Sequence, residues 1–218
     1  MFYCIHSLNR KIVGQLSYKR VFAKTEKTVT QFFEQHGKKN LTYHNIQHTQ
    51  YVVHKTLEIA AHYPITDEQL VVLYVAAWFH DTGYLIAEPK KHELKSTEVL
   101  KNAAGELGLT DKQVDEINRC ILATRYPRKP VGLLEEIICD ADTFNLGTMD
   151  FWDTNKRMFR ELLAERKDKL NKVLFDQETI RFMGIHQYYT AYCKQFLKQG
   201  KAQNKKQLQA ASLQKPLK

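Results

Sequence analysis

Apolar residues along most of this chain return every three or four positions, which is the spacing of one face of an α-helix. In the stretch 45–62, for example, Val52, Val53 and Leu57 recur at this spacing. No segment shows the strict alternation of apolar and polar residues that is typical of a half-buried strand. The helices predicted from the pattern span residues 25–37, 45–62, 64–81, 94–107, 109–125, 132–147, 150–170 and 177–199.

Start signals support two of these helices. Thr66 is followed by Gln69, and Thr110 by Gln113, and both pairs match the capping box that begins many helices. The chain has 218 residues, of which 43% are hydrophobic, so it can bury a sizeable core without disulfides. We therefore expect an all-α fold, a compact helical bundle built as a single domain over residues 1–198.

The positive charge is concentrated at the C-terminal end. The chain carries 33 Lys and Arg against 24 Asp and Glu, a net charge of +9. Eight of the basic residues and no acidic residue lie in 179–218, which leaves 25 basic against 24 acidic residues in the rest. We expect residues 199–218 to form a disordered basic tail or a frayed helix. Such a segment either serves solubility or binds polyanions weakly and in a salt-dependent way.

The sequence also indicates a compartment. The longest apolar run, 70–79, is too short to cross a bilayer and predicts a buried helix. The first residues lack the basic start and long apolar stretch of a secretory signal. The 4 cysteines are scattered and form no Cys-x-x-Cys pair, which is typical of reduced thiols. We expect a cytoplasmic protein without a transmembrane segment.

Histidine and aspartate residues recur near the ends of predicted helices. His44 and His48 stand four residues apart in "LTYHNIQH". His80 and Asp81 follow the most apolar helix, in "AAWFHDTGYL", and Asp142 lies in "CDADTFNLG". A carboxylate drawn toward the interior needs a partner, and a metal ion is the strongest one available. Each short motif occurs by chance, but together they predict a metal site with imidazole and carboxylate ligands.

This order of residues resembles the metal-binding signature of the HD superfamily, whose helical members are mostly metal-dependent phosphohydrolases and phosphodiesterases. The resemblance covers about 41–147 and implies an HD-domain-like bundle. "YHNIQH" is similar to the Tyr-His-Asn-x-x-His stretch of cyclic nucleotide phosphodiesterases, which implies that His44 is the general acid. Within "CDADTFNLG" the similarity favours Asp142 over Asp140. The implied metal ligands are His48, His80, Asp81 and Asp142.

The chain also departs from parts of this family. "HDTGYL" lacks the further Asp-His pair of the cyclic nucleotide enzymes and the acidic residues of the stringent-response hydrolases. His92 resembles a ligand to a second ion, but the next histidine expected near "ILATRYPRKP" is missing and Arg125 occupies that region. We therefore expect one divalent ion and leave a second open, together with its identity among Mn, Fe, Mg, Zn, Co and Ni.

The resemblance implies hydrolysis of a small phosphate ester, such as a nucleotide, by a metal-activated water. Asp81 would orient that water as a base or bridge to a second ion, and His44 would protonate the leaving oxygen. Positive charge must offset the phosphate oxygens. Arg125 is the first choice for this role, with Arg128 as another candidate. The remaining substrate-binding candidates are Lys91 and Asn45.

Two other functions remain open at this stage. Some HD proteins are di-iron oxygenases, which use a fuller set of histidines than this chain shows. Alternatively, the domain is a non-catalytic nucleotide-binding regulatory module that uses its basic end to meet RNA or a membrane. The sequence does not decide the oligomeric state.

Overall fold

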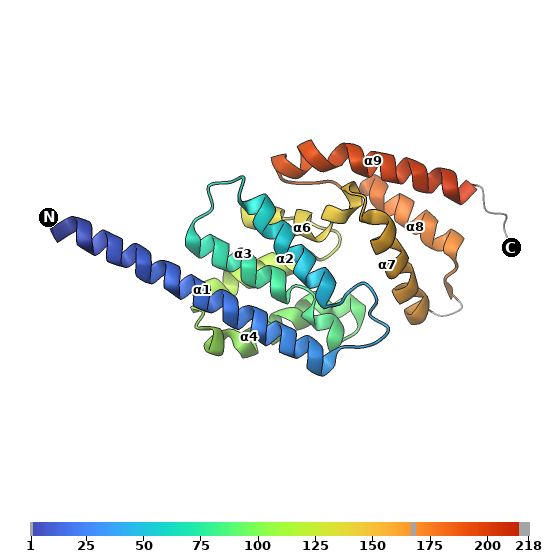
Figure 1. The fold of residues 1–218 in the computed structure, drawn as a ribbon. Coiled ribbons are helices and arrows are strands. Elements are labelled where there is room, and N and C mark those ends of the chain that lie inside the picture. Colours follow the sequence, from blue (N-terminus) through green and yellow to red (C-terminus); the bar gives the residue numbers. More distant parts are fainter. Residues whose placement is uncertain (1, 167–168, 214–218) are drawn as a thin grey trace.

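Regular structure in the described part of the chain is helical, as the apolar spacing predicts. The structure is a computed structural model that describes residues 2–166 and 169–213 (Figure 1). No strand occurs within these residues, so the predicted all-α class is confirmed. The α-helices are α1 Phe2–His36, α2 Ile46–Ala60, α3 Asp67–Phe79, α4 His92–Leu107, α5 Asp111–Ala123, α6 Leu133–Asp142, α7 Phe151–Arg166, α8 Lys172–Ile185 and α9 Ala191–Leu213. Short 3₁₀ helices lie between them, namely η1 Thr82–Leu85, η2 Pro89–Lys91 and η3 Phe144–Gly147.

Helix α3 forms the centre of the bundle. Every residue from Val71 to Phe79 is buried, because α1, α2, α5 and α6 pack around this helix. A helix that is covered on all sides needs no polar face, which explains its unbroken apolar run. The helix ends at Phe79, so His80 and Asp81 lie at its buried end and not at the surface.

Side-chain caps fix where helices begin, and both predicted capping boxes are present. Helix α2 begins with a further cap that the sequence pattern did not predict. The side-chain oxygen of Asn45 accepts the backbone N–H groups of Gln47 (3.0 Å) and His48 (3.2 Å). These are N–H groups that the first helical turn leaves without a partner. The cap therefore holds the first turn of α2 in register with the loop before it.

Helices α7, α8 and α9 lie together beside the main bundle (Figure 1). They follow η3 in the chain. The helix predicted over 132–147 is two elements in the structure, α6 and η3, which are divided at Thr143. Their own small apolar cluster is separate from the large core around α3. Its buried members are Leu146, Phe151, Met183 and Leu208. The second group of helices is thus attached at the end of α6, where Asp142 lies.

One predicted helix is two helices in the structure. The expectation of a continuous helix over 177–199 is wrong, because residues 186–190 separate α8 from α9. The backbone N–H groups of Tyr189 (2.9 Å) and Thr190 (2.8 Å) donate to the buried carboxylate of Asp140 on α6. These N–H groups are therefore satisfied by a side chain instead of a helical carbonyl, and the chain turns at this point.

The C-terminal end is a packed helix and not a disordered tail. Of the two alternatives expected for 199–218, the disordered tail is wrong as far as Leu213, where the helix α9 ends, and residues 214–218 lie outside the described part. Asn204 and Leu208 on this helix are buried, at 5% and 2% exposure. Charge composition alone suggested a tail, but one face of the segment packs against the protein.

The contact between α9 and η3 depends on two glycines. A Cβ atom added to Gly200 would lie 2.1 Å from the carbonyl oxygen of Gly147. A Cβ atom added to Gly147 would lie 2.6 Å from the carbonyl oxygen of Leu197. No larger residue fits at either position without moving the backbone. The side-chain amide of Asn204 adds hydrogen bonds to the carbonyl oxygens of Leu146 (3.0 Å) and Thr148 (2.8 Å).

Candidate functional site

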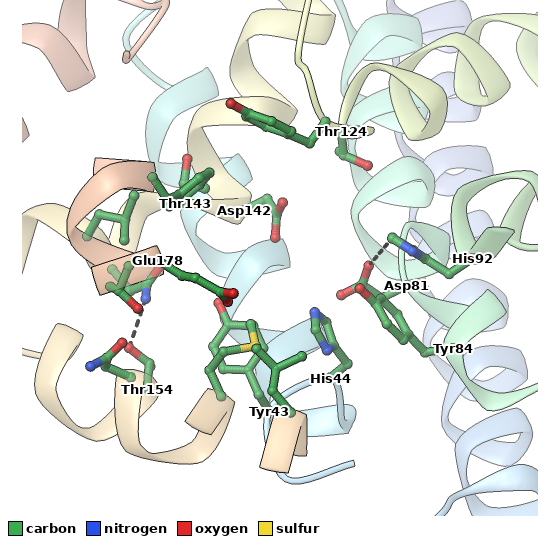
Figure 2. A pocket seen from close by; sticks show the side chains of 18 of the residues that line it. Tyr43, His44, Asp81, Tyr84, His92, Thr124, Asp142, Thr143, Thr154 and Glu178 are labelled. Atoms are coloured by element: carbon green, nitrogen blue, oxygen red, sulfur yellow. Dashed lines mark hydrogen bonds and ion pairs between the residues drawn. The ribbon is translucent and has the colours of Figure 1, made fainter. Parts of the chain in front are cut away.

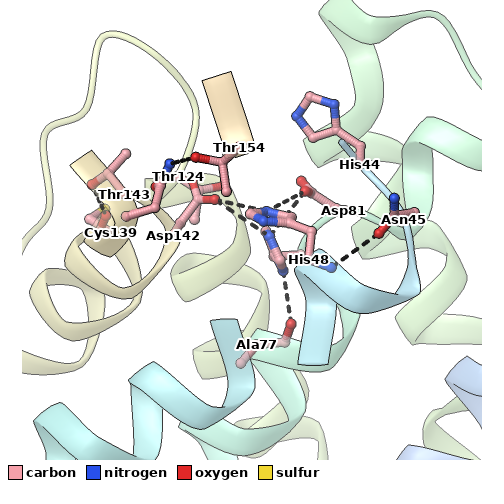
Figure 3. A network of polar contacts seen from close by, with 12 residues as sticks. His44, Asn45, His48, Ala77, Asp81, Thr124, Cys139, Asp142, Thr143 and Thr154 are labelled. Atoms are coloured by element: carbon pink, nitrogen blue, oxygen red, sulfur yellow. Dashed lines mark hydrogen bonds and ion pairs between the residues drawn. The ribbon is translucent and has the colours of Figure 1, made fainter. Parts of the chain in front are cut away.

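The four predicted metal ligands come together at the ends of three helices. His48 lies in the first turn of α2, His80 and Asp81 follow α3, and Asp142 is the last residue of α6. One donor atom from each of the four lies within 4.8 Å of all the others. Figure 3 shows the side chains of His48, Asp81 and Asp142 converging on one point.

The distances within the cluster are those of atoms that face a common centre. Nε2 of His48 lies 3.3 Å from Asp81 Oδ2 and 3.3 Å from Asp142 Oδ1. Nε2 of His80 lies 3.1 Å and 3.7 Å from the same two oxygens. Nevertheless, the two Nε2 atoms and Asp81 Oδ2 are buried without a hydrogen-bond partner of acceptable geometry. Buried polar atoms without partners are rare, and two imidazoles with two carboxylates fit a divalent transition-metal ion.

A hydrogen bond of the His80 ring determines which of its two nitrogens can bind a metal. Its Nδ1 lies 2.8 Å from the carbonyl oxygen of Ala77, one turn earlier in α3. A carbonyl only accepts, so Nδ1 carries a proton in either charge state of the ring, and Nε2 is the nitrogen that faces the cluster. Histidine ligands of metal ions in proteins are usually held by a contact of this kind.

The two carboxylates determine the electrostatics of the cluster. Burial opposes protonation of His80, but the adjacent Asp81 carboxylate and Asp142 raise its pKa to about 10. Burial likewise opposes ionisation of Asp81 and Asp142, yet the positive charges of His80 and Arg128, respectively, hold the pKa of each carboxyl well below its usual range. The two carboxylates therefore stay ionised and attract positive charge to this point, whether a proton on histidine or a metal ion.

The arginine at the site is Arg128, while Arg125 is exposed and does not line the cavity. The chain turns after α5, which points Arg128 back at the cluster. Its guanidinium forms an ion pair with Asp142 and donates to the carbonyl oxygens of Thr124 (3.0 Å) and Cys139 (3.1 Å). Of the two arginine candidates, the structure thus places Arg128 at the cavity and Arg125 away from it.

His44 does not join the ligands and is held by a carboxylate of α7. Its Nδ1 contacts Oε1 of Glu161, and the other oxygen, Oε2, accepts the backbone N–H groups of Tyr43 (2.7 Å) and His44 (3.0 Å). Glu161 is 4% exposed. Because Nδ1 is occupied by this carboxylate, Nε2 is the nitrogen left to exchange a proton within the cavity. The structure places His44 and His48 against different partners, although they are neighbours on the chain.

His92 lies beside the cluster and contributes a second group of donor atoms. Its ring packs on one face of Tyr84, whose other face packs on His44, with centroids 3.9 Å and 3.8 Å apart. Nδ1 of His92 lies 2.6 Å from the carbonyl oxygen of Pro89, so Nε2 is again the free nitrogen. This Nε2 lies 3.5 Å from Asp81 Oδ1 and 3.5 Å from Glu93 Oε1. Asp81 thus faces the main cluster with one oxygen and His92 with the other.

A glycine permits this arrangement. A Cβ atom added to Gly83 would lie 1.9 Å from the carbonyl oxygen of His92. The backbone of η1, which follows Asp81, can therefore approach the beginning of α4 only because residue 83 has no side chain. The close approach explains why His92, eleven residues after Asp81, lies next to its carboxylate.

The two remaining substrate-binding candidates lie elsewhere. Asn45 caps α2 and does not line the cavity, so it positions His48 through the backbone. Lys91 is exposed at the end of η2 and is also absent from the cavity wall. Neither side chain is placed to bind a substrate in this cavity.

Asp81 and Asp142, with His92 and Glu93, line a cavity of about 420 Å³. Figure 2 shows Asp81 and His92 on one side of it and Asp142 and Glu178 on the other. The far wall is formed by α7 and α8. Glu161 lies on the same face of α7 as Phe151 and Met158, at helical spacing. A single carboxylate among apolar residues on one helix face is the sequence signal that could have identified Glu161 as a buried residue of the site.

No family model, curated protein or solved structure matches this chain. The resemblance to the HD superfamily therefore stays a prediction that rests on the residues themselves. Within residues 2–166 and 169–213, no helix combines the length and the apolar character needed to cross a membrane.

Proposed function

We propose that this protein is a metal-dependent phosphohydrolase or phosphodiesterase that hydrolyses a nucleotide or another small phosphate ester. The observation that carries the proposal is the cluster of His48, His80, Asp81 and Asp142. The Nε2 atoms of both histidines and Oδ2 of Asp81 are buried in it without hydrogen-bond partners. A divalent ion held there lowers the pKa of water and offsets the charge of phosphate oxygens. Cys120, Cys139 and Cys193 are free and buried, which favours a cytoplasmic location.

The surrounding side chains supply the remaining steps. His44 lines the cavity with its Nδ1 held by Glu161, so a proton on Nε2 is available to the departing oxygen. When only one ion is bound, Asp81 accepts a proton from the attacking water through its second oxygen. Arg128 lines the same end of the cavity and offsets negative charge on the phosphate.

A second ion fits beside the first. Oδ1 of Asp81, Nε2 of His92 and Oε1 of Glu93 surround this position from two elements. Three donors are fewer than most divalent ions require, so water would complete the shell. We propose that this position is weaker than the main cluster and fills at higher metal concentration.

Elemental analysis combined with a hydrolysis panel tests the proposal. The purified full chain is loaded with Mn²⁺ and assayed with p-nitrophenyl phosphate, bis(p-nitrophenyl) phosphate and a set of nucleotides. His48→Ala should lose both bound metal and activity. His44→Ala should keep the metal and lose activity by about 10²–10⁴-fold, the usual contribution of a general acid.

His54→Ala is the matched control, because this side chain on α2 is 75% exposed. It should change neither metal content nor rate. Equal metal content in wild type and His48→Ala would refute the metal centre. Metal binding with no hydrolysis of any ester would instead favour the non-catalytic nucleotide-binding module.

A further inference from the structure

The cavity extends well beyond the proposed metal centre, into a compartment between α7 and α8. We propose that this compartment binds the organic body of the substrate, and that the substrate is a monophosphate ester whose body is flat, largely apolar and of nucleoside size. The inference rests on the proposed function and adds the substrate class to it.

The size of the cavity exceeds what a phosphate group needs. Its volume of about 420 Å³ falls within the ~300–1,000 Å³ typical of sites that enclose a whole small organic ligand. Apolar side chains of both helices line the compartment. Displacing water from such a surface by an apolar group of a ligand is favourable in free energy. The members of this wall are Phe151, Met158, Leu162, Phe175 and Phe182.

Aromatic rings favour a flat body over a flexible chain. Phe182 and Tyr126 meet edge to face with centroids 5.9 Å apart, and both line the cavity. Such rings offer surface on which a planar group stacks. Asn155 and Thr179 add an amide and a hydroxyl to the same wall, which suits a planar group with polar edges, such as a nucleobase.

The charges in the cavity favour a single phosphate. Among the described residues that line it, the only cations besides histidine are Arg128 and Arg166, and each is paired with a carboxylate, that of Asp142 or Glu178. Asp81 and Glu93 add further negative charge. A triphosphate would bring several charges with no unpaired cation to receive them, whereas one phosphate needs only the proposed metal centre.

The ion pair of Arg166 and Glu178 is part of the wall of the compartment. It joins α7 to α8, with the two nitrogen-to-oxygen contacts of Nη1 at 3.1 and 2.8 Å. Both side chains are about half exposed, at 40% and 44%. The compartment therefore has largely apolar walls with one ion pair in them, and the phosphate chemistry lies at its inner end.

Steady-state kinetics of the Mn²⁺-loaded full chain test this with three compounds: adenosine 5′-monophosphate, adenosine 5′-triphosphate and glycerol 3-phosphate. Glycerol 3-phosphate has the same phosphate and no apolar body. We expect kcat/KM for the nucleoside monophosphate to exceed that of either other compound by about tenfold or more. A Leu162→Trp substitution fills the compartment and should raise KM for the nucleoside monophosphate by about tenfold, with glycerol 3-phosphate hydrolysis changed by less than about twofold.

Leu163→Trp is the matched control, since Leu163 is the next residue on α7, is 39% exposed and is absent from the cavity wall. It should alter neither substrate. Thr179→Trp narrows the compartment from α8 and provides a second variant should Leu162→Trp fail to fold. If glycerol 3-phosphate or the triphosphate is hydrolysed as well as the monophosphate, the inference is wrong and the proposed function stands.

Failure of the proposed function has a different signature. Wild type would then release phosphate from none of the three compounds. Calorimetry with adenosine 5′-monophosphate still judges the compartment in that case. Binding that is lost in Leu162→Trp and kept in Leu163→Trp would support the compartment, and absence of binding to wild type would overturn it.

Discussion

Glu161 is the residue whose replacement tests the site most directly. It is a buried carboxylate on α7 that accepts three hydrogen bonds from the loop preceding α2, one from the His44 ring and two from backbone N–H groups. Glu161→Gln preserves the shape of the side chain and leaves one oxygen where there were two. Whichever way the amide turns, its NH₂ group faces a group that was donating a hydrogen bond.

The size of the effect follows from these contacts. Hydrogen bonds to a charged group contribute about 1.5–3 kcal/mol each, so losing one or two of the three should cost about 3 kcal/mol. For a chain of this length that corresponds to a fall of about 6–12 °C in Tm. The protein should stay folded, because typical stabilities are about 5–15 kcal/mol. The catalytic rate should fall about 10–100-fold because His44 loses its orientation, with metal content unchanged.

The pH dependence provides a second measurement. Burial opposes ionisation of Glu161, but the hydrogen bond and charge of His44, with the two backbone N–H groups, lower its pKa below the ordinary value of 4.5. A lowered pKa means that the stabilisation is present above pH 4.5 and is lost as pH falls through the pKa of the folded protein. The difference in unfolding free energy between wild type and Glu161→Gln should therefore be largest near neutral pH and shrink in acid.

Urea unfolding at several pH values measures this difference. Glu165→Gln, one turn further along α7 and exposed, is the matched control and should be neutral. An equal Tm for wild type and Glu161→Gln would show that the contacts with the loop do not stabilise the protein. A loss of stability that is the same in acid as at neutral pH would show that the carboxylate charge plays no part.

Three further predictions concern the surroundings of the site. Burial and the charge of Lys201 lower the pKa of His186 to about 3, so the unfolded chain binds a proton at this residue more readily than the folded one. The free energy of unfolding of wild type should therefore fall as pH falls from about 6.5 toward 3. Urea unfolding should show a weaker fall in His186→Asn. Gly200→Ala should lower Tm by several degrees, since its Cβ would lie 2.1 Å from a carbonyl oxygen of η3, whereas a disordered tail would tolerate it; calorimetry distinguishes the two. Arg128→Gln should lower both Tm and activity by removing the partner of a buried carboxylate, whereas Arg125→Gln should change unfolding free energy by less than about 0.5 kcal/mol.

The metal cluster could be predicted because each ligand belongs to a short motif at the end of a recognisable helix. His80 and Asp81 follow an apolar run that had to be buried, so their own burial was implied by position. Asp142 similarly ends a helix with an apolar face. The sequence alone does not show that these motifs lie close together in the folded protein. That expectation came from the resemblance to a known signature.

The choice between Arg125 and Arg128 could not be made in the same way. Both follow α5 in a connection without helical periodicity, and which one turns inward is decided by the path of the backbone. The same holds for residues 186–190, where apolar and aromatic residues at helical spacing suggested one helix. There the carboxylate of Asp140, about fifty residues earlier, captures two backbone N–H groups and breaks the helix. Local patterns carry no information about such partners.

The proposed site extends beyond the motif core of 41–147. This core contains every proposed metal ligand, but the carboxylate that holds His44 comes from α7, and so does one wall of the cavity. Met158 and Leu162 flank Glu161 on this helix, so a substrate body that packs on α7 contacts the same element that orients the proton donor. A displacement of α7 would alter substrate fit and acid catalysis together, while the ligand cluster, built from α2, α3 and α6, would keep its geometry.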